Sequence, residues 1–279
     1  MPLIRNSYGK ARVRVMRVHK DCEHHEVREL AVQAMLEGDF GASYTAADNR
    51  LVIATDTIKN LTYVVAREAL DDAAEEFAER LAQRFLHLYP QVASATVTTH
   101  ETKWLRARFG GRDHPHGFIL DGNGQGFARV GADRGTVSVV SGFTGYSFMK
   151  TTGSGWENYV MDEFTTLPET SDRIAATSMD ATWRWSRVPA DCPAVNAAIL
   201  ETMLEVFATT YSHSLQDSLL RMGEAALACA PEIEEISLSC PNKHYLPVNL
   251  APFGLSSDNA VFVPTDEPHG QIECTVGRS

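Results

Sequence analysis

Four polar side chains of different chemistry follow one another near the C-terminal end of the sequence, in Asn242-Lys243-His244-Tyr245. They come directly after an apolar stretch with the pattern of a strand. Because side chains alternate between the two faces of a strand, Asn242 and His244 share one face and Lys243 and Tyr245 the other. An amide and an imidazole on one face can address the same ligand through hydrogen bonds and proton transfer. An exposed polar strand edge is an equally good interpretation of these residues taken alone.

Thr55 and Asp56 lie at a predicted junction between a strand and a helix. The first turn of a helix leaves backbone N–H groups without partners, and such a helix N-terminus suits a small anion. A hydroxyl and a carboxylate are also typical of an ordinary helix cap, which the local sequence alone favours. The pair is therefore a candidate anion site that needs support from the rest of the chain.

Three further side chains have the shape to hold a planar ligand. The guanidinium of Arg173 can pair with a carbonyl oxygen and a ring nitrogen through two parallel donors, which lysine cannot do. Gln216 follows Ser214-Leu215 at the predicted start of a helix, and Trp156 is a large ring in a glycine-rich loop. A surface salt bridge for Arg173 and a core position for Trp156 are the ordinary alternatives. None of these residues identifies a reaction by itself.

Histidines gather in two short segments of the sequence. One segment contains His19, Cys22, His24 and His25, and the other is His114-Pro115-His116. None of these spacings resembles the ligand spacings of known zinc sites, and His24 and His25 would point to opposite faces of a strand. We therefore interpret them as solvated loop histidines and predict no metal site.

The elements that must position these residues follow from hydrophobic periodicity. Apolar and basic residues alternate from Ala11 to Val18, which is typical of a strand with one buried face. From residue 71 to 89 the apolar positions recur at spacings of three and four, which predicts an amphipathic helix that Pro90 ends. Further strands are predicted over 27–36, 51–54, 93–99, 104–109, 117–120 and 126–130, and a further helix over 58–69.

The second half of the sequence repeats this order. Strand-like stretches cover 136–140, 143–150, 183–185 and 233–239, and helices are predicted over 195–211 and 214–230. Ala54-Thr55 leads to helix, Pro90 and strand in the first half, and Ala176-Thr177 leads to helix, Pro231 and strand in the second. This duplication predicts an α+β fold of two tandem units, residues 1–134 and 135–279, whose antiparallel sheets each carry helices on one face.

Composition limits the classes of function. The 279 residues suffice for a large core, and the five cysteines show no paired spacing, which indicates free thiols in a reducing compartment. The sequence shows no signal peptide, no membrane-spanning run and no Ser-Lys-Leu type of peroxisomal address, so we expect a soluble cytoplasmic protein. The net charge of −11 argues against nonspecific binding to nucleic acid or anionic lipid. An anionic substrate would therefore need a locally positive pocket.

Several ungapped motifs together resemble the urate oxidase (uricase) family in their residues and order. They extend along almost the whole chain, from Tyr8 to Arg278. The motifs include Tyr8-Gly9-Lys10, Ala54-Thr55-Asp56-Thr57-Ile58-Lys59-Asn60, Lys150-Thr151-Thr152, Thr165-Thr166-Leu167, Asp172-Arg173-Ile174, Ala181-Thr182-Trp183 and Pro241-Asn242-Lys243-His244-Tyr245. The resemblance implies the tunnelling fold (T-fold), in which two chains close a β-barrel tunnel and two barrels stack into a homotetramer.

The resemblance implies that the chain oxidises urate with dioxygen to 5-hydroxyisourate and releases hydrogen peroxide, with no metal and no other cofactor. Lys10, Thr55 and His244 correspond to the family's catalytic proton relay. The residues that correspond to its substrate-binding set are Thr55, Asp56, Trp156, Arg173, Leu215, Gln216 and Asn242. Trp156 stands where the family usually has phenylalanine, and an indole would still stack on the substrate.

The resemblance also implies a site at a subunit interface, with Lys10 and Thr55 from one chain and the other residues from its neighbour. Two alternatives stay open. One is a T-fold enzyme that acts on pterins with zinc, for which the chain has histidines to spare. The other is a purine-binding or scaffold tetramer without turnover, for which Trp156 is the only hint. The presence of Lys10, Thr55 and His244 together argues against the second alternative.

Overall fold

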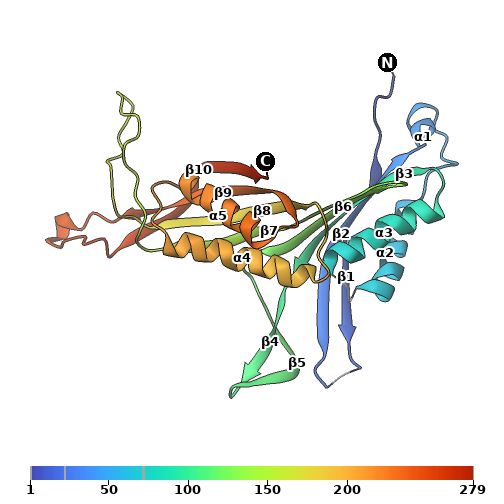
Figure 1. Ribbon diagram of the computed structural model, residues 1–279, viewed down its shortest axis with the longest axis horizontal. Helices are drawn as coiled ribbons and strands as arrows, with labels where there is room; N and C mark the ends of the chain where they lie inside the picture. Colours follow the sequence, from blue (N-terminus) through green and yellow to red (C-terminus); the bar gives the residue numbers. More distant parts are fainter. Residues whose placement is uncertain (1, 22, 71–72, 279) are drawn as a thin grey trace. The chain divides into compact units, whose positions relative to one another are not determined.

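A computed structural model describes residues 2–21, 23–70 and 73–278 of the chain (Figure 1). The chain divides into two compact units, each described separately below. Unit 1 comprises Met1–Phe143 with Arg184–Pro193, and unit 2 comprises Thr144–Trp183 with Ala194–Ser279. Among the described residues, no helix combines the length and the apolar character needed to cross a bilayer.

Unit 1 is an antiparallel sheet with helices. Its strands are β1 (Tyr8–His19), β2 (Glu26–Gly38), β3 (Val92–Thr102), β6 (Gln125–Asp133) and the first part of β7 (Val137–Lys150), in the spatial order β1-β2-β3-β6-β7. Its helices are α1 (Gly41–Thr45), α2 (Thr55–Ala69) and α3 (Ala74–Leu88). The strands β4 (Trp104–Phe109) and β5 (Arg112–Leu120) form a separate antiparallel hairpin.

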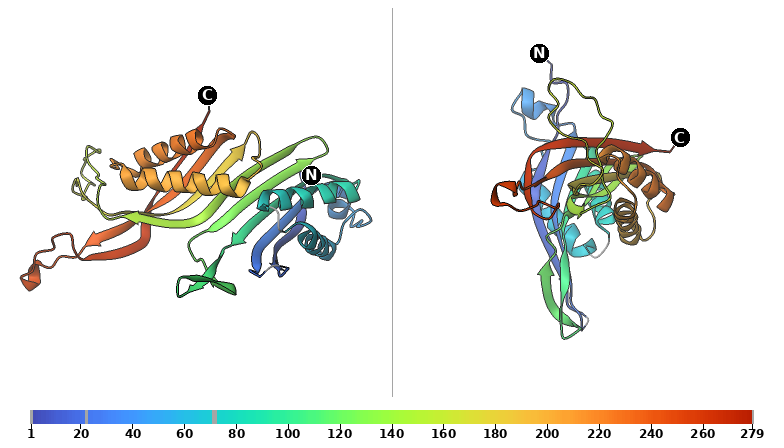
Figure 2. Two further views of the ribbon diagram at one scale, coloured as in Figure 1. Left: turned by 60° about the horizontal axis from the view of Figure 1, so that its bottom comes forward. Right: turned by 90° about the vertical axis from the view of Figure 1, so that its left-hand side faces the viewer.

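The core of unit 1 lies between one face of this sheet and the helices (Figure 2). Phe77, Leu81 and Phe85 of α3 are fully buried, and α3 packs on β3 and β6, where Val97 and Val130 are also fully buried. Their spacing on the helix is the one predicted from the sequence, because an amphipathic helix must turn its apolar stripe to the sheet. The predicted helix is therefore confirmed from Ala74 onward, whereas its predicted start at residues 71 and 72 lies outside the described residues.

Unit 2 repeats this architecture. Its strands are the last part of β7, β8 (Ala175–Trp185, of which the last two residues belong to unit 1), β9 (Ile233–Pro247) and β10 (Phe262–Gly277), in the order β7-β8-β9-β10. Its helices are α4 (Cys192–Thr209), α5 (Leu215–Cys229) and the short 3-10 helix η1 (Ala251–Phe253). Gly223 lets α5 approach the sheet closely, since a Cβ there would lie 2.7 Å from the Val276 side chain. When α1, η1 and the β4–β5 hairpin are set aside, the order strand-strand-helix-helix-strand-strand occurs twice. The division into units 1–134 and 135–279 stays a prediction.

Two parts of the prediction are wrong. Residues 51–54 form a turn and an extended segment instead of a strand, because the backbone N–H of Ile53 is bonded to the Tyr8 hydroxyl and not to a neighbouring strand. Ala176-Thr177 lies inside β8 and does not lead directly into a helix, so Thr177 is not the counterpart of Thr55. The last strand, β10, was not predicted, because most of its residues are exposed and its apolar residues alternate only near its end.

A buried carboxylate in unit 1 yields a stability prediction. Glu29 of β2 is 5% exposed and accepts hydrogen bonds from Arg14 and from the Trp104 indole N–H at 3.0 Å. These bonds, with that of Arg14 the largest cause, lower the pKa of Glu29. The folded-state pKa is therefore below the unfolded value of about 4.3, so the stabilisation is present above that pH and is lost as the pH falls through the folded-state pKa.

We expect Glu29→Gln to lower the free energy of unfolding by about 2 kcal/mol at neutral pH, because Arg14 and Trp104 lose a charged acceptor that is itself buried. Urea unfolding at pH 7 and at pH 3.5 measures the effect, which should be smaller at the lower pH. The matched control is Glu37→Gln, since Glu37 pairs with Arg5 at the exposed end of the same strand and should lose at most about 0.5 kcal/mol. Equal losses for the two variants would contradict the prediction.

Candidate active site

Lys10 lies beside an irregularity in β1. Lys10 pairs with Ala34 of β2 and the pairing resumes with Val13 opposite Val32, so β1 contains one extra residue at this point. Arg12, within this β-bulge, has a φ of 55°, in the left-handed region that side chains other than glycine seldom adopt. Bulges redirect neighbouring side chains and are frequent beside active sites. The half-buried Lys10 therefore owes its direction to a local departure from regular strand geometry.

Tyr8 joins this strand to the segment that precedes α2. Its hydroxyl accepts a hydrogen bond from the Ile53 backbone N–H at 2.7 Å, and its ring packs edge-on against Phe40 with the centroids 4.8 Å apart. Gly9 fits because a Cβ there would lie 1.9 Å from the Ala34 carbonyl oxygen. The Tyr-Gly-Lys motif thus fixes β1 to the start of α2, a structural role for Tyr8 that its sequence pattern did not reveal.

The helix α2 begins at Thr55 without a side-chain cap. Ala54 is the N-cap residue, and its carbonyl accepts the first intrahelical bond, from Ile58 N–H at 3.2 Å. The N–H groups of Thr55, Asp56 and Thr57 therefore have no acceptor within the helix. Thr55 is thus not the helix cap that local sequence favours, and this N-terminus is open to an anion.

Lys10 and Asp56 are close enough to interact electrostatically. The Asp56 carboxylate accepts hydrogen bonds from Lys59 and, at 3.1 Å, from Asn60. These neighbours lower the pKa of Asp56, with the Lys59 hydrogen bond the largest cause, and the charge of Lys10 adds to the lowering. Unit 1 therefore places the charge of Lys10 near the exposed Asp56, while the catalytic role of Lys10 and Thr55 stays a prediction.

In unit 2, Trp156 and Arg173 are held side by side. Trp156 forms an antiparallel bridge with Thr170, with N···O distances of 2.7 and 3.1 Å, and the Arg173 backbone N–H donates to Ser154 at 2.8 Å. The Arg173 guanidinium carbon lies 5.7 Å from the centroid of the Trp156 ring. Burial lowers the pKa of Arg173, and its Nε is buried without a hydrogen-bond partner in the described part of the chain. A buried cationic donor without an acceptor, beside an aromatic face, fits a planar anionic ligand.

Gln216 lies at the start of α5, close to the same loop. The side chain of the N-cap residue Ser214 accepts from the Asp217 N–H at 3.0 Å, which leaves the N–H groups of Leu215 and Gln216 without acceptors in the helix. Ser212, just before the helix, exchanges two backbone hydrogen bonds of 2.9 Å with Gly153 and Gly155. This bridge brings the start of α5 beside the Trp156 loop.

Asn242 and His244 extend β9 beyond this helix. Ile236, Leu238 and Cys240 are buried under the helices, and Asn242 and His244 continue the same face of the strand. The 15 residues of α5 span about 21 Å, and β9 covers this length in about seven residues. Since β9 runs back from the C-terminal end of α5, Asn242 and His244 lie just beyond the helix N-terminus. Neither side chain has a hydrogen-bond partner among the described residues.

All four residues lie within β9, so Lys243 and Tyr245 are on the face of the strand opposite to Asn242 and His244. The Lys243 ammonium is 3.4 Å from the Asp266 carboxylate of β10. This ion pair holds the Lys243 side chain on the face of β9 opposite to the one that carries Asn242 and His244. Unit 2 therefore brings Trp156 and Arg173 close to the start of α5, and from the lengths of α5 and β9 we infer that Asn242 and His244 lie near the same end of the helix.

Comparison with known proteins assigns the chain to a family. The sequence profile of the uricase family matches residues 6–130 and 139–273, which is most of the chain. The chain belongs to the uricase family. Uricase from Arthrobacter globiformis is 39% identical over 273 residues, which cover 98% of this chain and 89% of the relative. Uricase from Arabidopsis thaliana is 40% identical, over 97% of this chain and 94% of the relative.

Solved structures support the same assignment. The crystal structure of uricase from Arthrobacter globiformis has a TM-score of 0.95 to this chain, with 38% identity, and the match covers 100% of this chain and 95% of the solved one. The α+β fold with an antiparallel sheet and helices is therefore that of solved uricases.

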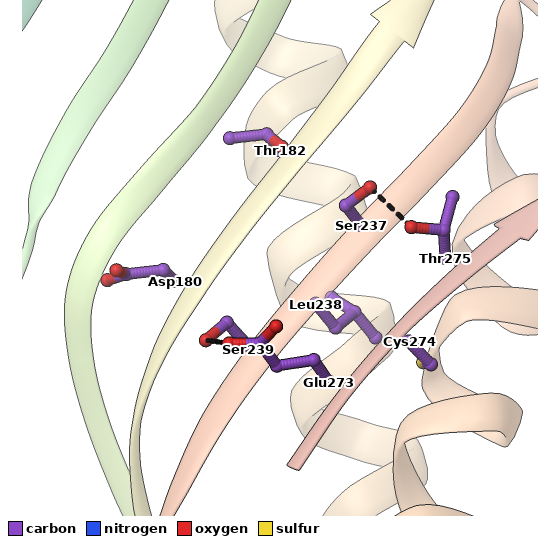
Figure 3. A pocket seen from close by; sticks show the side chains of 8 residues that line it. All are labelled: Asp180, Thr182, Ser237, Leu238, Ser239, Glu273, Cys274 and Thr275. Carbon is purple, nitrogen blue, oxygen red and sulfur yellow. Dashed lines mark hydrogen bonds between the residues drawn. The ribbon is translucent and has the colours of Figure 1, made fainter. Parts of the chain in front are cut away.

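A pocket of about 400 Å³ in this member of the uricase family lies elsewhere, between residues of β8, β9 and β10 (Figure 3). Its lining residues are Asp180, Thr182, Ser237, Leu238, Ser239, Glu273, Cys274 and Thr275. Asp180 accepts from the Gly145 N–H at 2.7 Å, and Ser237 is bonded to Thr275 at 2.8 Å. Two carboxylates and no cationic side chain make this pocket unsuitable for a urate anion, so we do not assign the substrate to it.

Members of the two histidine segments lie close together in space. The ring centroids of His114 and His116 are 4.6 Å apart, and those of His25 and His116 are 5.8 Å apart. Among residues 2–21, 23–70 and 73–278, no three histidine, cysteine or acidic side chains have the geometry to hold a metal ion. Cys22, part of the first histidine segment, lies outside the described residues.

Proposed function

We propose that the chain converts urate, dioxygen and water into 5-hydroxyisourate and hydrogen peroxide without a metal or an organic cofactor. Membership of the uricase family makes it an oxidoreductase that acts on urate with dioxygen. The observation that carries the proposal is the half-buried Arg173 guanidinium, whose buried Nε has no partner in the described part of the chain, beside the Trp156 ring and near the start of α5. In a chain with a net charge of −11, these donors supply the local positive potential that an anionic purine needs.

The substrate would lie on the Trp156 ring, with its edges bound by hydrogen bonds. The Arg173 guanidinium would donate to a carbonyl oxygen and a ring nitrogen in parallel, and the Gln216 amide would bind the adjoining edge. The backbone N–H groups of Leu215 and Asp56 would donate to further purine atoms, as helix N-termini do to anions. Such fixed donors hold the purine in one orientation, which is what positioning by an enzyme requires.

The substrate supplies the electrons in this reaction. The Lys10 amine, through the Thr55 hydroxyl, would remove a proton from urate, and His244 would complete the proton relay. The resulting electron-rich purine gives two electrons to the dioxygen that Asn242 holds above the ring, and a C–O bond forms at one ring carbon to give a hydroperoxide. The bond from this carbon to the peroxide then breaks, water adds at the same carbon, and the protons return through the relay to give 5-hydroxyisourate and hydrogen peroxide. Arg173 stabilises the negative charge that develops on the purine during these steps.

The two groups of residues would meet between chains. We propose a homotetramer of T-fold barrels, in which Lys10 and Thr55 of one chain complete a site that contains Trp156, Arg173, Leu215, Gln216, Asn242 and His244 of the neighbour. Large exposed apolar side chains support an assembly of this kind, because such surfaces are usually covered by another chain. They include Leu105, Phe109, Ile119 and Leu120 on the β4–β5 hairpin and Leu246, Phe253, Leu255 and Val263 around η1. We also propose a cytoplasmic location, which free cysteines favour.

Turnover by metal-free protein tests this proposal directly. After dialysis against a chelator, the purified protein should remove the ultraviolet absorbance of urate and consume one dioxygen for each urate, because no step needs a metal. Oxygen uptake, peroxide release and metal content should be measured on the same sample. Loss of turnover on chelation that zinc restores would contradict the proposal and favour a zinc-dependent T-fold enzyme. Tight urate binding without oxygen uptake would instead favour a purine-binding protein.

A further inference from the structure

Tyr211 lies in the short connection between α4 and α5 and contacts the loop that carries Arg173. Its hydroxyl donates to the Ser171 carbonyl oxygen at 2.7 Å, two residues before Arg173 in the chain. The side chain is 37% exposed, so the bond is only partly shielded from water. This hydrogen bond ties the segment in front of α5 to the backbone that positions the guanidinium.

The same hydroxyl lies against the Trp156 loop. A Cβ on Gly155 would be 2.3 Å from the Tyr211 hydroxyl oxygen, so a side chain at position 155 would push the tyrosine away from Ser171. Tyr211 also opposes the lowering of the pKa of Arg173 by burial, which indicates that the phenol lies near the guanidinium. The Tyr211 hydroxyl therefore bonds to the backbone segment that carries Arg173 and lies against the backbone segment that carries Trp156.

The residues on either side of Tyr211 are fixed as well. Lys150 donates to the Thr210 carbonyl oxygen at 2.7 Å, and Ser212 pairs with the backbone of the glycine-rich loop on both sides. The Ser212 hydroxyl accepts from Ser218 of α5 at 2.6 Å in a buried environment. Residues 210–212 thus connect β7, the segment that carries Arg173, the Trp156 loop and α5. The helix α5 itself starts at Leu215.

We propose that Tyr211 is a positioning residue, which sets the distance between the Arg173 guanidinium and the N-terminus of α5 with Gln216. A planar purine bound at both edges needs these donors at a fixed separation, to within about 0.5 Å. Tyr211 spans that separation because its backbone leads into α5 and its hydroxyl holds Ser171. This inference deepens the proposed function and rests on it.

Tyr211→Phe tests the inference, because it keeps the ring and removes only the hydroxyl. We expect the Kd of urate, titrated without oxygen, and the KM to rise about tenfold, the effect of one lost hydrogen bond, while kcat changes less than about threefold. The matched control is Tyr44→Phe, since the exposed Tyr44 hydroxyl also donates to a backbone carbonyl oxygen, that of Ser7 in unit 1, at 3.4 Å. The control should bind urate as the unchanged protein does.

A double variant separates positioning from general stability. If Tyr211 acts through Arg173, Tyr211→Phe should weaken binding less than about twofold in an Arg173→Lys background. A full tenfold effect in that background, or a lower thermal midpoint with an unchanged Kd, would overturn the inference. The Kd is measured without oxygen, so it tests the positioning role independently of turnover. If the unchanged protein does not oxidise urate but Tyr211→Phe still weakens urate binding, the proposed reaction is refuted and the positioning role is supported.

Discussion

Arg173→Lys is expected to weaken urate binding by about a hundredfold. The substitution keeps the positive charge but replaces two parallel donors with a single ammonium, which cannot pair with a carbonyl oxygen and a ring nitrogen together. Hydrogen bonds of charged groups contribute about 1.5–3 kcal/mol each, and 1.4 kcal/mol corresponds to about tenfold in affinity. The unpartnered Nε of Arg173 is the donor whose loss this variant measures.

The measurement is a titration of urate without oxygen, together with KM from steady-state oxidation. Arg84→Lys serves as the control, because Arg84 forms an exposed ion pair with Glu68 on the helices of unit 1 and should change binding less than about twofold. Arg173→Lys with unchanged affinity would show that the guanidinium is a structural group, and the assignment of the substrate to this part of unit 2 would fail.

Thr55→Ala is expected to bind urate almost normally but to turn it over about a hundredfold to ten-thousandfold more slowly. The Thr55 hydroxyl does not cap α2, because Ala54 is the N-cap residue and the helix has no side-chain cap. Removal of this hydroxyl should therefore affect proton transfer alone. Lys10→Met should show the same separation of kcat from KM. Because the two residues act in one relay, the double variant should be little slower than either single variant.

Thr55→Ser is the informative rescue, since it restores a hydroxyl at the same position and should recover most of the rate. Thr57→Ala provides the control, because Thr57 is an exposed hydroxyl in the same helical turn and has no predicted role. Single-turnover kinetics with saturating urate separate the chemical step from product release. A kcat that is the same in Thr55→Ala as in the unchanged protein would remove Thr55 from the relay.

The parts of the fold that depend on repeated patterns could be predicted from the sequence. The stripe of Phe77, Leu81 and Phe85 predicts α3, and the predicted strand that carries Asn242 and His244 is part of β9. Both follow from periods that a helix and a strand impose on any sequence. Motif resemblance then supplied the roles that periodicity alone does not give.

The contacts that assemble the site could not be predicted in the same way. The apolar run at residues 51–54 resembles a strand, but Tyr8, more than forty residues earlier, accepts the Ile53 N–H that a strand partner would need. The bridge between Trp156 and Thr170 joins two positions in an irregular loop with no period. The bulge beside Lys10 depends on the left-handed backbone of Arg12, a residue type that gives no sign of it. Each of these contacts is set by tertiary packing and not by local preference.

The uncapped start of α2 has a consequence for engineering. Serine, threonine, aspartate and asparagine at an N-cap stabilise a helix because their oxygen accepts one of the free N–H groups. At position 54 such an oxygen would occupy the donors proposed for the substrate, and a carboxylate would also repel an anion. Heat resistance and catalysis therefore compete for the same few backbone hydrogens, so a search for more durable variants should leave Ala54 unchanged and seek its gains in other helices.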